Sequence, residues 1–224
     1  MSDLKLLGLR VSVYTRIARL ALAEKKIAYQ FDEVDIFADS GPPADYLALN
    51  PFGAIPCLRH GEFVLYETAA INRYLDEVFP PVLLQPSAPA ERARMNQIIG
   101  VLDSYGYRPM IWEVYAQRSV VPAGGGEADE DLIAAALPGL RQVLQQLDEW
   151  RAEQRFLAGD AITLADLHAY PMLHYFIETP EGAEMLDSFP RLQQWLREMQ
   201  ARDSVRTTAF HEDSWNGAAD EAFR

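Results

Sequence analysis

Short apolar runs and amphipathic segments alternate along the first 80 residues. Residues 4–9 form an apolar run broken by one charge, which predicts a buried strand. Residues 15–26 follow a helical period, with Ile17 and Leu20 on the apolar side. Residues 29–36 alternate weakly, as in a strand near the edge of a sheet. The pattern places the basic residues of the helix on its solvated side: Arg16, Arg19, Lys25 and Lys26.

A hairpin and a further helix complete this half of the chain. Residues 55–58 and 62–66 are expected to be strands around the turn dipeptide His60-Gly61. A helix follows from Glu67-Thr68, because its apolar residues recur at the spacing i, i+4, i+7. The order is therefore β-α-β, a loop and then β-β-α, which is the plan of a thioredoxin-like α/β domain.

The remainder of the chain is proline-rich at first and helical afterwards. Residues 79–89 contain four prolines and are expected to form a linker. Helical periodicity then covers residues 90–117, with a kink expected at Pro109, and residues 132–151, with a break at Pro138-Gly139. Thr163 to Asp166 form a capping box that begins another helix. The pattern predicts a domain over residues 1–80, a linker over 81–89 and an all-helical domain over 90–224.

Charge and cysteine content narrow the class of protein. The formal net charge is -13, and a surface this acidic repels nucleic-acid phosphates and anionic lipid, so neither nucleic acid nor membrane is expected as a partner. The single cysteine, Cys57, falls in a predicted buried strand and is expected to be an inert core residue. One cysteine fits a reducing compartment, and no signal peptide or membrane-length apolar run is present, so a cytoplasmic protein is expected.

Residues 50–75 carry the most specific chemical signal in the sequence. Asn50-Pro51 and Phe52-Gly53 are turn dipeptides. Pro56 cannot donate to a β-ladder, and a cis peptide bond before it would leave the backbone of Ile55 unpaired and facing outward. The next helix begins at Thr68, and a helix N-terminus favours an anion. An unpaired backbone edge beside a helix N-terminus predicts a site for a peptide-like ligand with a carboxylate.

At these residues the chain resembles a known family. The motif N-P-F-G-x-I-P, a hairpin and then E-T-x-x-I-x-x-Y-L resembles the glutathione-site half of the cytosolic glutathione S-transferases, and the resemblance extends over nearly the whole chain. It implies a cis-proline at Pro56 and pairing of the Ile55 backbone with the cysteinyl unit of glutathione. It also implies that Glu67 and Thr68 hold the γ-glutamyl end.

Ser12 is the candidate catalytic residue. It lies where the first strand turns into the first helix, so its hydroxyl can donate to a thiolate beside the positive end of that helix. The segment S-V-Y-T-R resembles the S-x-x-[ST]-R segment of serine-type, bacterial-like transferases, in which the serine activates glutathione. An ordinary helix cap at Ser12 or Thr15 is the alternative. Thr15 is the alternative hydroxyl, and Tyr14 is a third, although Tyr14 is expected to pack or to border the substrate pocket.

One departure from the family concerns the glycine end of glutathione. Related transferases grip the glycine carboxylate with basic or amide side chains in the loop before the N-P-x-G motif and just after its glycine. Here residues 37–45 contain no Lys, Arg or His, and the residue after Gly53 is Ala54. Ser40 or another subunit could substitute, glutathione could bind weakly, or the thiol ligand could differ.

The resemblance implies a homodimer that conjugates the glutathione thiolate to a hydrophobic electrophile, as in detoxification. The electrophile pocket is expected to include Tyr14, Tyr107, Ile111 and Tyr115. The alternatives are another glutathione-dependent enzyme (a peroxidase, dehalogenase or isomerase) and a non-catalytic binding or regulatory protein of the same fold. Glutathione is the only cosubstrate expected. No metal is expected, because His168 and His174 do not share a helix face and no carboxylate motif accompanies them.

Overall fold

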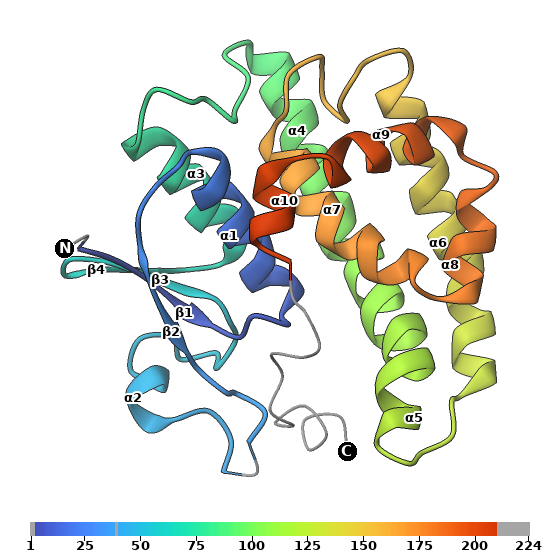
Figure 1. The fold of residues 1–224 in the computed structure, drawn as a ribbon, viewed down its shortest axis with the longest axis horizontal. Coiled ribbons are helices and arrows are strands. Elements are labelled where there is room, and N and C mark those ends of the chain that lie inside the picture. The colour runs from blue at the N-terminus through green and yellow to red at the C-terminus, as the bar shows by residue number, and fades with distance from the viewer. Residues whose placement is uncertain (1–2, 39, 210–224) are drawn as a thin grey trace. The chain divides into compact units, whose positions relative to one another are not determined.

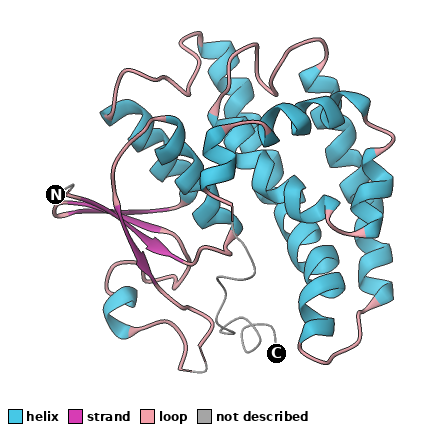
Figure 2. Cartoon of the chain, viewed as in Figure 1, coloured by secondary structure: helices cyan, strands magenta, loops and turns pink. Residues whose placement is uncertain are grey.

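The computed structural model describes residues 3–38 and 40–209 and divides the chain into two compact units. The first unit comprises the described residues up to Leu83 together with those from Asp203 onward, and the second is Leu84–Arg202. Figure 2 shows that the strands belong to the first unit and that the second is built from helices and loops. The return of the chain at Asp203 to the first unit differs from the sequence-based range of 90–224 for the helical part.

The first unit is a four-stranded mixed sheet with helices on both faces (Figure 1). Its strands lie in the order β2-β1-β3-β4, with β1 and β2 parallel and the other neighbours antiparallel. This is the predicted thioredoxin-like arrangement, and the prediction is confirmed. The strands are β1 (Leu4–Gly8), β2 (Gln30–Glu33), β3 (Cys57–His60) and β4 (Phe63–Tyr66), and the helices are α1 (Val13–Glu24), α2 (Ala44–Leu47), α3 (Thr68–Val78) and α10 (Asp203–Thr207).

Two clusters of buried side chains hold this sheet between its helices. On one face, Leu6 and Leu58 pack with Leu22 of α1 and Ile71 of α3. On the other face, a smaller cluster that includes Cys57 covers the sheet beneath α2. Removal of these apolar surfaces from water stabilises the fold and fixes where the ends of α1 and α3 lie.

The basic residues of α1 are buried, contrary to the expectation from the hydrophobic pattern. Arg16, Arg19 and Lys25 are 2%, 6% and 8% exposed, and of the four predicted to be solvated only Lys26 is exposed. Lys25 Nζ lies 2.9 Å from Asp76 Oδ1 and also donates to the carbonyl of Val82.

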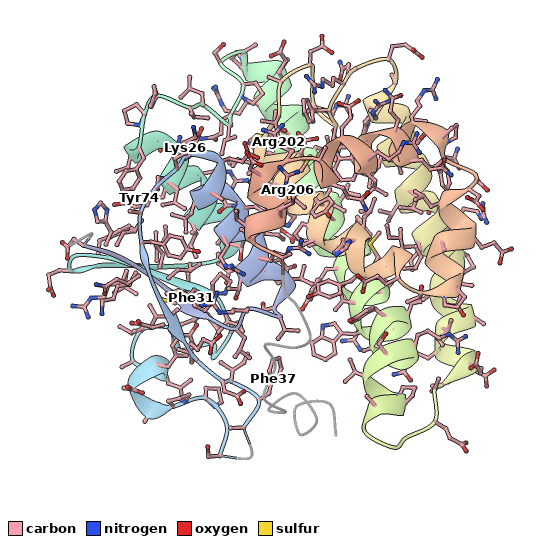
Figure 3. The ribbon with its side chains drawn as sticks, in the orientation of Figure 1. Lys26, Phe31, Phe37, Tyr74, Arg202 and Arg206 are labelled. Carbon is pink, nitrogen blue, oxygen red and sulfur yellow. The ribbon has the colours of Figure 1, made fainter. Side chains whose placement is uncertain are left out.

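Arg19 is covered by the C-terminal part of the first unit. Its guanidinium donates to the carbonyl of Thr208 at 3.2 Å, just beyond α10, which packs on α1. It also lies 5.7 Å from the ring centre of Phe31, labelled in Figure 3. A helical period cannot reveal such a partner, because Thr208 lies 189 residues further along the chain.

The second unit packs its helices around α7. This helix is buried along most of its length and contacts α4, η2 and α8. Its elements are α4 (Pro89–Val101), η1 (Leu102–Gly106), η2 (Arg108–Val120), α5 (Val121–Ala123), α6 (Glu130–Arg151), α7 (Leu164–Ile177), α8 (Pro180–Leu186) and α9 (Pro190–Gln200).

Two predicted helix interruptions differ from the structure. The segment expected to be one kinked helix is α4 followed by two π-helical stretches, η1 and η2, with Pro109 near the start of η2. Helix α6 continues through Pro138 without a break. π-Helical geometry is rare and often occurs at functional sites. The aromatic residues of this stretch are therefore candidates for a binding site.

The predicted capping box at the start of α7 is confirmed, and it is part of a larger buried network. Asp166 Oδ2 accepts from the backbone N–H of Thr163 at 2.8 Å and from its hydroxyl at 2.9 Å. Asp166 Oδ1 accepts from the N–H of Leu157 at 2.8 Å and from Trp195 Nε1 at 2.9 Å. Burial raises the pKa of the Asp166 carboxyl, and these four donors act in the opposite direction.

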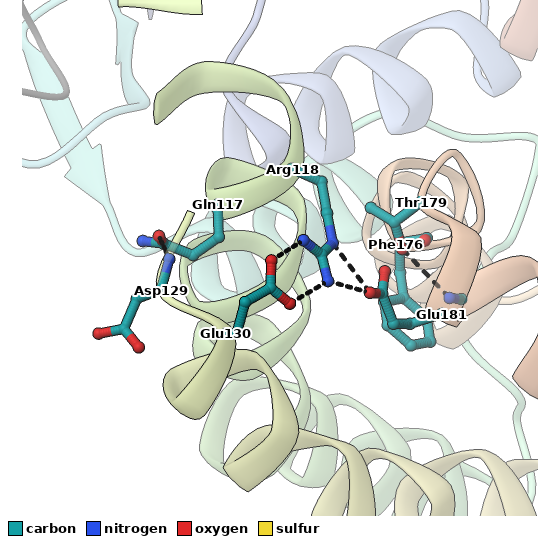
Figure 4. Close-up of polar contacts among 8 residues, drawn as sticks. Gln117, Arg118, Asp129, Glu130, Phe176, Thr179 and Glu181 are labelled. Atoms are coloured by element: carbon teal, nitrogen blue, oxygen red, sulfur yellow. Dashed lines mark hydrogen bonds and ion pairs between the residues drawn. The ribbon is translucent and has the colours of Figure 1, made fainter. Parts of the chain in front are cut away.

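Arg118 at the end of η2 forms ion pairs with two other helices (Figure 4). Its Nη1 and Nη2 donate to the two carboxylate oxygens of Glu130 at 2.6 and 2.8 Å, and its Nε donates to Glu181 Oε1 at 2.8 Å. By donating these hydrogen bonds, Arg118 holds the pKa values of both carboxyl groups below their usual range.

These depressed pKa values predict an acid-sensitive contribution to stability. A carboxylate with a lower pKa in the folded state stabilises the fold above its unfolded pKa of about 4.3, and that contribution is lost as the pH falls through the folded pKa. Arg118→Ala should therefore show a smaller drop in Tm between neutral and acidic pH than the wild type, measured by circular dichroism. Arg141→Ala, an exposed arginine on α6, is the control and should keep the wild-type drop. Equal drops in all three proteins would contradict this role of Arg118.

Candidate active site

Ser12 is the N-cap of α1. Its Oγ accepts a hydrogen bond from the backbone N–H of Thr15 at 3.3 Å, and its backbone is extended rather than helical. The Oγ acceptor role leaves the hydroxyl proton to be donated elsewhere. The side chain is half-buried at the positive end of a 12-residue helix. The geometry is therefore compatible with both roles considered for Ser12, helix cap and donor to a thiolate.

Thr15, the alternative hydroxyl, lies in the core. It is fully buried, and its Oγ1 makes no hydrogen bond to any residue that the structure describes. A Cβ atom at Gly8 would lie only 2.5 Å from this oxygen, so the absence of a side chain at the end of β1 leaves room for Thr15. The burial of Thr15 favours Ser12 as the hydroxyl that meets a ligand.

The turn before β3 presents an unpaired backbone. The Ile55–Pro56 peptide bond is cis, as predicted. Within residues 3–38 and 40–209, the N–H and C=O of Ile55 make no backbone hydrogen bond. The preceding turn is fixed because the Tyr46 hydroxyl and Asn50 Nδ2 both donate to the carbonyl of Ala54, at 2.6 and 2.7 Å. A rigid turn thus holds free backbone groups beside the sheet.

Helix α3 begins next to this turn with a strained residue. Glu67 has φ 70° and ψ 107°, a conformation that L-residues rarely adopt and that costs about 1–3 kcal/mol. Its side chain is exposed, whereas Thr68 is 7% exposed. No side chain of the described residues caps the first amides of this 11-residue helix. Backbone strain concentrates at functional sites, and uncapped amides favour an anion.

The sequence identified Glu67 and Thr68 as candidate binding residues, but it did not indicate the strained backbone of Glu67. Glutamate has no preference for positive φ, so only the backbone of the folded protein reveals it. The loop at residues 37–45 contains no Lys, Arg or His, so none of its side chains can hold an anion by charge. Ser40 is exposed there, and Phe37 is labelled in Figure 3.

The four residues expected in the electrophile pocket belong to both units. Tyr14 is half-buried on α1, and Tyr107, Ile111 and Tyr115 recur every four residues along the π-helical stretch. Trp112 Nε1 donates to the Tyr107 hydroxyl at 3.1 Å, and burial raises the pKa of Tyr107. The rings of Tyr115 and Tyr175 lie 4.8 Å apart.

Three further side chains that could carry chemistry, those of Cys57, His168 and His174, are buried or lie beside carboxylates. Cys57 is fully buried and burial raises its pKa to about 11, so the prediction that it is a core residue is confirmed. His168 Nε2 lies 2.7 Å from Asp103 Oδ1, and His174 Nε2 lies 3.4 Å from Glu178 Oε1. The described residues contain no group of three or more His, Cys, Asp or Glu side chains arranged to hold a metal. Among them, too, no helix is both long and apolar enough to cross a bilayer.

Comparison with known proteins agrees with this geometry. The family model for the glutathione S-transferase N-terminal domain matches residues 11–78, and that for the C-terminal domain matches residues 98–203. Glutathione S-transferase 1 of Triticum aestivum is 28% identical over 94% of this chain and 95% of its own. The apo structure of a glutathione S-transferase III is 30% identical, with a TM-score of 0.78 over 92% of this chain and 94% of its own.

A third relative was solved with a glutathione conjugate. Glutathione S-transferase I from maize, in complex with an atrazine–glutathione conjugate, is 27% identical, with a TM-score of 0.80 over 92% of this chain and 95% of its own. The matched models cover both units, and the thioredoxin-like sheet carries the cis-proline turn and the Glu67-Thr68 helix start. On this evidence the chain belongs to the glutathione S-transferase family.

Proposed function

We propose that the protein is a glutathione transferase that conjugates the glutathione thiolate to a hydrophobic electrophile. Family membership supports the reaction class, and the maize relative was solved with such a conjugate. For this chain, the proposal rests on two structural features that occur in the same unit. These are the half-buried Ser12 at the start of α1 and the uncapped, strained start of α3 beside the free backbone of Ile55.

Each group has a distinct role in the proposed site. The Ile55 backbone, after which Pro56 turns the chain into β3, pairs with the cysteinyl unit of glutathione. Thr68 and the amides of α3 hold the γ-glutamyl carboxylate, while the Glu67 carboxylate holds the γ-glutamyl ammonium group. Ser12 then donates a hydrogen bond to the sulfur, and together with the positive end of α1 it lowers the pKa of the thiol.

The aromatic positions supply the proposed binding surface for the electrophile. Tyr14, Tyr107, Ile111 and Tyr115 offer apolar area with polar edges, which suits an aromatic or alkyl electrophile. The sulfur attacks the electrophilic carbon, forms the C–S bond and displaces the leaving group with its electron pair. By family membership we further propose a cytoplasmic homodimer with a detoxifying role, and sedimentation of the purified protein tests the dimer.

A turnover assay tests the reaction. Purified protein with glutathione and 1-chloro-2,4-dinitrobenzene should give saturable formation of the conjugate, with release of chloride. Binding of glutathione without turnover of a panel of aryl halides, epoxides and enones would favour the non-catalytic alternative. The absence of glutathione binding at any accessible concentration would overturn the proposal itself.

Thr68→Val should separate binding from chemistry. Valine has nearly the shape of threonine but lacks the hydroxyl, so the γ-glutamyl carboxylate loses one charge-assisted hydrogen bond. KM for glutathione should rise about tenfold, with a much smaller change in kcat, as measured by initial rates. Thr207→Val, which makes the same change at an exposed threonine on α10 of the same unit, should leave both constants unchanged. An unchanged KM in Thr68→Val would exclude Thr68 from the binding site.

A further inference from the structure

The end of the site that faces away from α3 differs in charge from the end at α3. An extended tripeptide that pairs its central residue with Ile55 directs its two ends in opposite directions along the backbone. On the proposed function, one end reaches Glu67 and Thr68, so the glycine end runs toward Ala54 and the turn before it. The chemistry around Ala54 therefore decides which C-terminal group the site accepts.

The contacts around Ala54 are uncharged. Its carbonyl is occupied by the Tyr46 hydroxyl and by Asn50 Nδ2. The neighbouring Gly53 packs against Pro42 and Leu47, whose side-chain carbons would lie 3.1 and 3.4 Å from a Cβ atom at that position. Ala54 itself is exposed and ends in a methyl group. This end of the site thus offers apolar carbon and a backbone amide, with no cationic side chain in these contacts.

The surrounding sequence adds negative charge. Residues 27–58 contain no Lys, Arg or His and five acidic residues, namely Asp32, Glu33, Asp35, Asp39 and Asp45. The carboxylate of Asp35 accepts from the N–H of Phe37 at 2.8 Å, and that of Asp45 accepts from the N–H of Tyr46 at 2.9 Å. Neither carboxylate forms an ion pair with a cation of the described residues, so neither charge is neutralised by such a pair.

Five cations of the first unit are already engaged. Lys5 and Arg10 pair with Asp32 and Glu33 on β2, at 3.5 and 3.1 Å. Arg59 pairs with Glu62 in the hairpin at 3.6 Å. Lys25 and Arg19 are buried against Asp76 and Thr208. None of these five cations is therefore available as a counter-ion for a carboxylate beside Ala54.

We infer that the protein binds its thiol substrate without a cation at the C-terminal end, and that it uses γ-glutamylcysteinyl thiols with a neutral C-terminus at least as well as glutathione. This inference rests on the proposed function and specifies the substrate class of the same site. The negative charge of the glycine carboxylate gains no counter-ion there and is repelled by Asp35 and Asp45. A neutral ester or amide at that end avoids the repulsion.

The test compares glutathione with its glycyl monoethyl ester as the thiol substrate, using one fixed electrophile. The wild-type kcat/KM for the ester should equal or exceed that for glutathione, and the difference should shrink as salt screens the repulsion. A site that holds the glycine carboxylate by a cation would instead favour glutathione by about tenfold or more. That result would overturn the inference while leaving the proposed function intact.

A charge-introducing variant separates the local effect from the net charge of the protein. Ala54→Lys should lower KM for glutathione about fivefold to tenfold and leave KM for the ester unchanged. The matched control is Ala28→Lys, which adds the same charge at an exposed alanine before β2, at the end of the sheet opposite to the start of β3. An equal effect of both variants would assign the preference to net charge and overturn the inference. Failure of the wild type to bind or use either thiol would overturn the proposed function as well.

Discussion

Replacing Ser12 by alanine should lower kcat for conjugation by about 10²–10³ while glutathione still binds within about threefold of the wild-type Kd. The hydroxyl is proposed to act on the sulfur alone, whereas the γ-glutamyl end is held by Glu67 and Thr68 on α3. Loss of the Ser12 donor therefore removes stabilisation of the thiolate but leaves most of the binding contacts. Initial-rate kinetics and isothermal titration with glutathione measure the two quantities separately.

A second substitution at Ser12 separates catalysis from helix capping. Aspartate is as good an N-cap as serine, so Ser12→Asp should keep the Thr15 N–H bonded and the Tm close to that of the wild type. Its negative charge cannot donate to a thiolate and repels it, so activity should fall at least as far as in Ser12→Ala. If Ser12→Asp or Ser12→Ala retained near wild-type turnover, Ser12 would be a helix cap and no more.

Replacing Asp166 by alanine should lower the free energy of unfolding by about 3–5 kcal/mol, the largest stability effect expected of a single polar residue in this protein. The carboxylate accepts four hydrogen bonds, which link the start of α7 to Leu157 and to Trp195 on α9. Its removal leaves the N–H groups of Leu157, Thr163 and Trp195 buried without an acceptor. Denaturant unfolding followed by tryptophan fluorescence measures the change.

The matched control for this prediction is Asp160→Ala, only six residues away. Asp160 is exposed and accepts one hydrogen bond, from the N–H of Arg155 at 3.2 Å, so its loss should cost about 1 kcal/mol or less. Activity per folded molecule should be unchanged in both variants, because neither residue belongs to the proposed site. A loss in Asp166→Ala no larger than that in Asp160→Ala would show that the buried network contributes little to stability.

Features fixed by local chemistry could be predicted from the sequence. The Asn50-Pro51 turn, the cis bond before Pro56 and the Thr163 capping box each depend on residues within a few positions of one another. The order of the strands and helices along the first unit also followed from the pattern, because apolar runs and amphipathic segments alternate there.

Features that depend on distant parts of the chain could not be predicted. Arg19 appeared solvated because the helical period does not reveal α10, which packs on α1 from the other end of the chain. The bond from Trp195 to Asp166 joins residues 29 positions apart. The left-handed backbone of Glu67 has no sequence signal at all. In the site, the sequence favoured Ser12 over Thr15, and the burial of Thr15 adds a structural reason for that choice.

The pKa of the thiol of glutathione bound to the protein tests the central claim most directly. Thiolate absorbs in the ultraviolet where the thiol does not, so a pH titration of the difference spectrum of the complex gives this pKa. The account predicts a value well below that of a free cysteine thiol, about 8.5, in the wild type, and a return toward that value in Ser12→Ala. A bound thiol that titrates like free glutathione in the wild type would contradict the account, because neither Ser12 nor the start of α1 would then be acting on the sulfur.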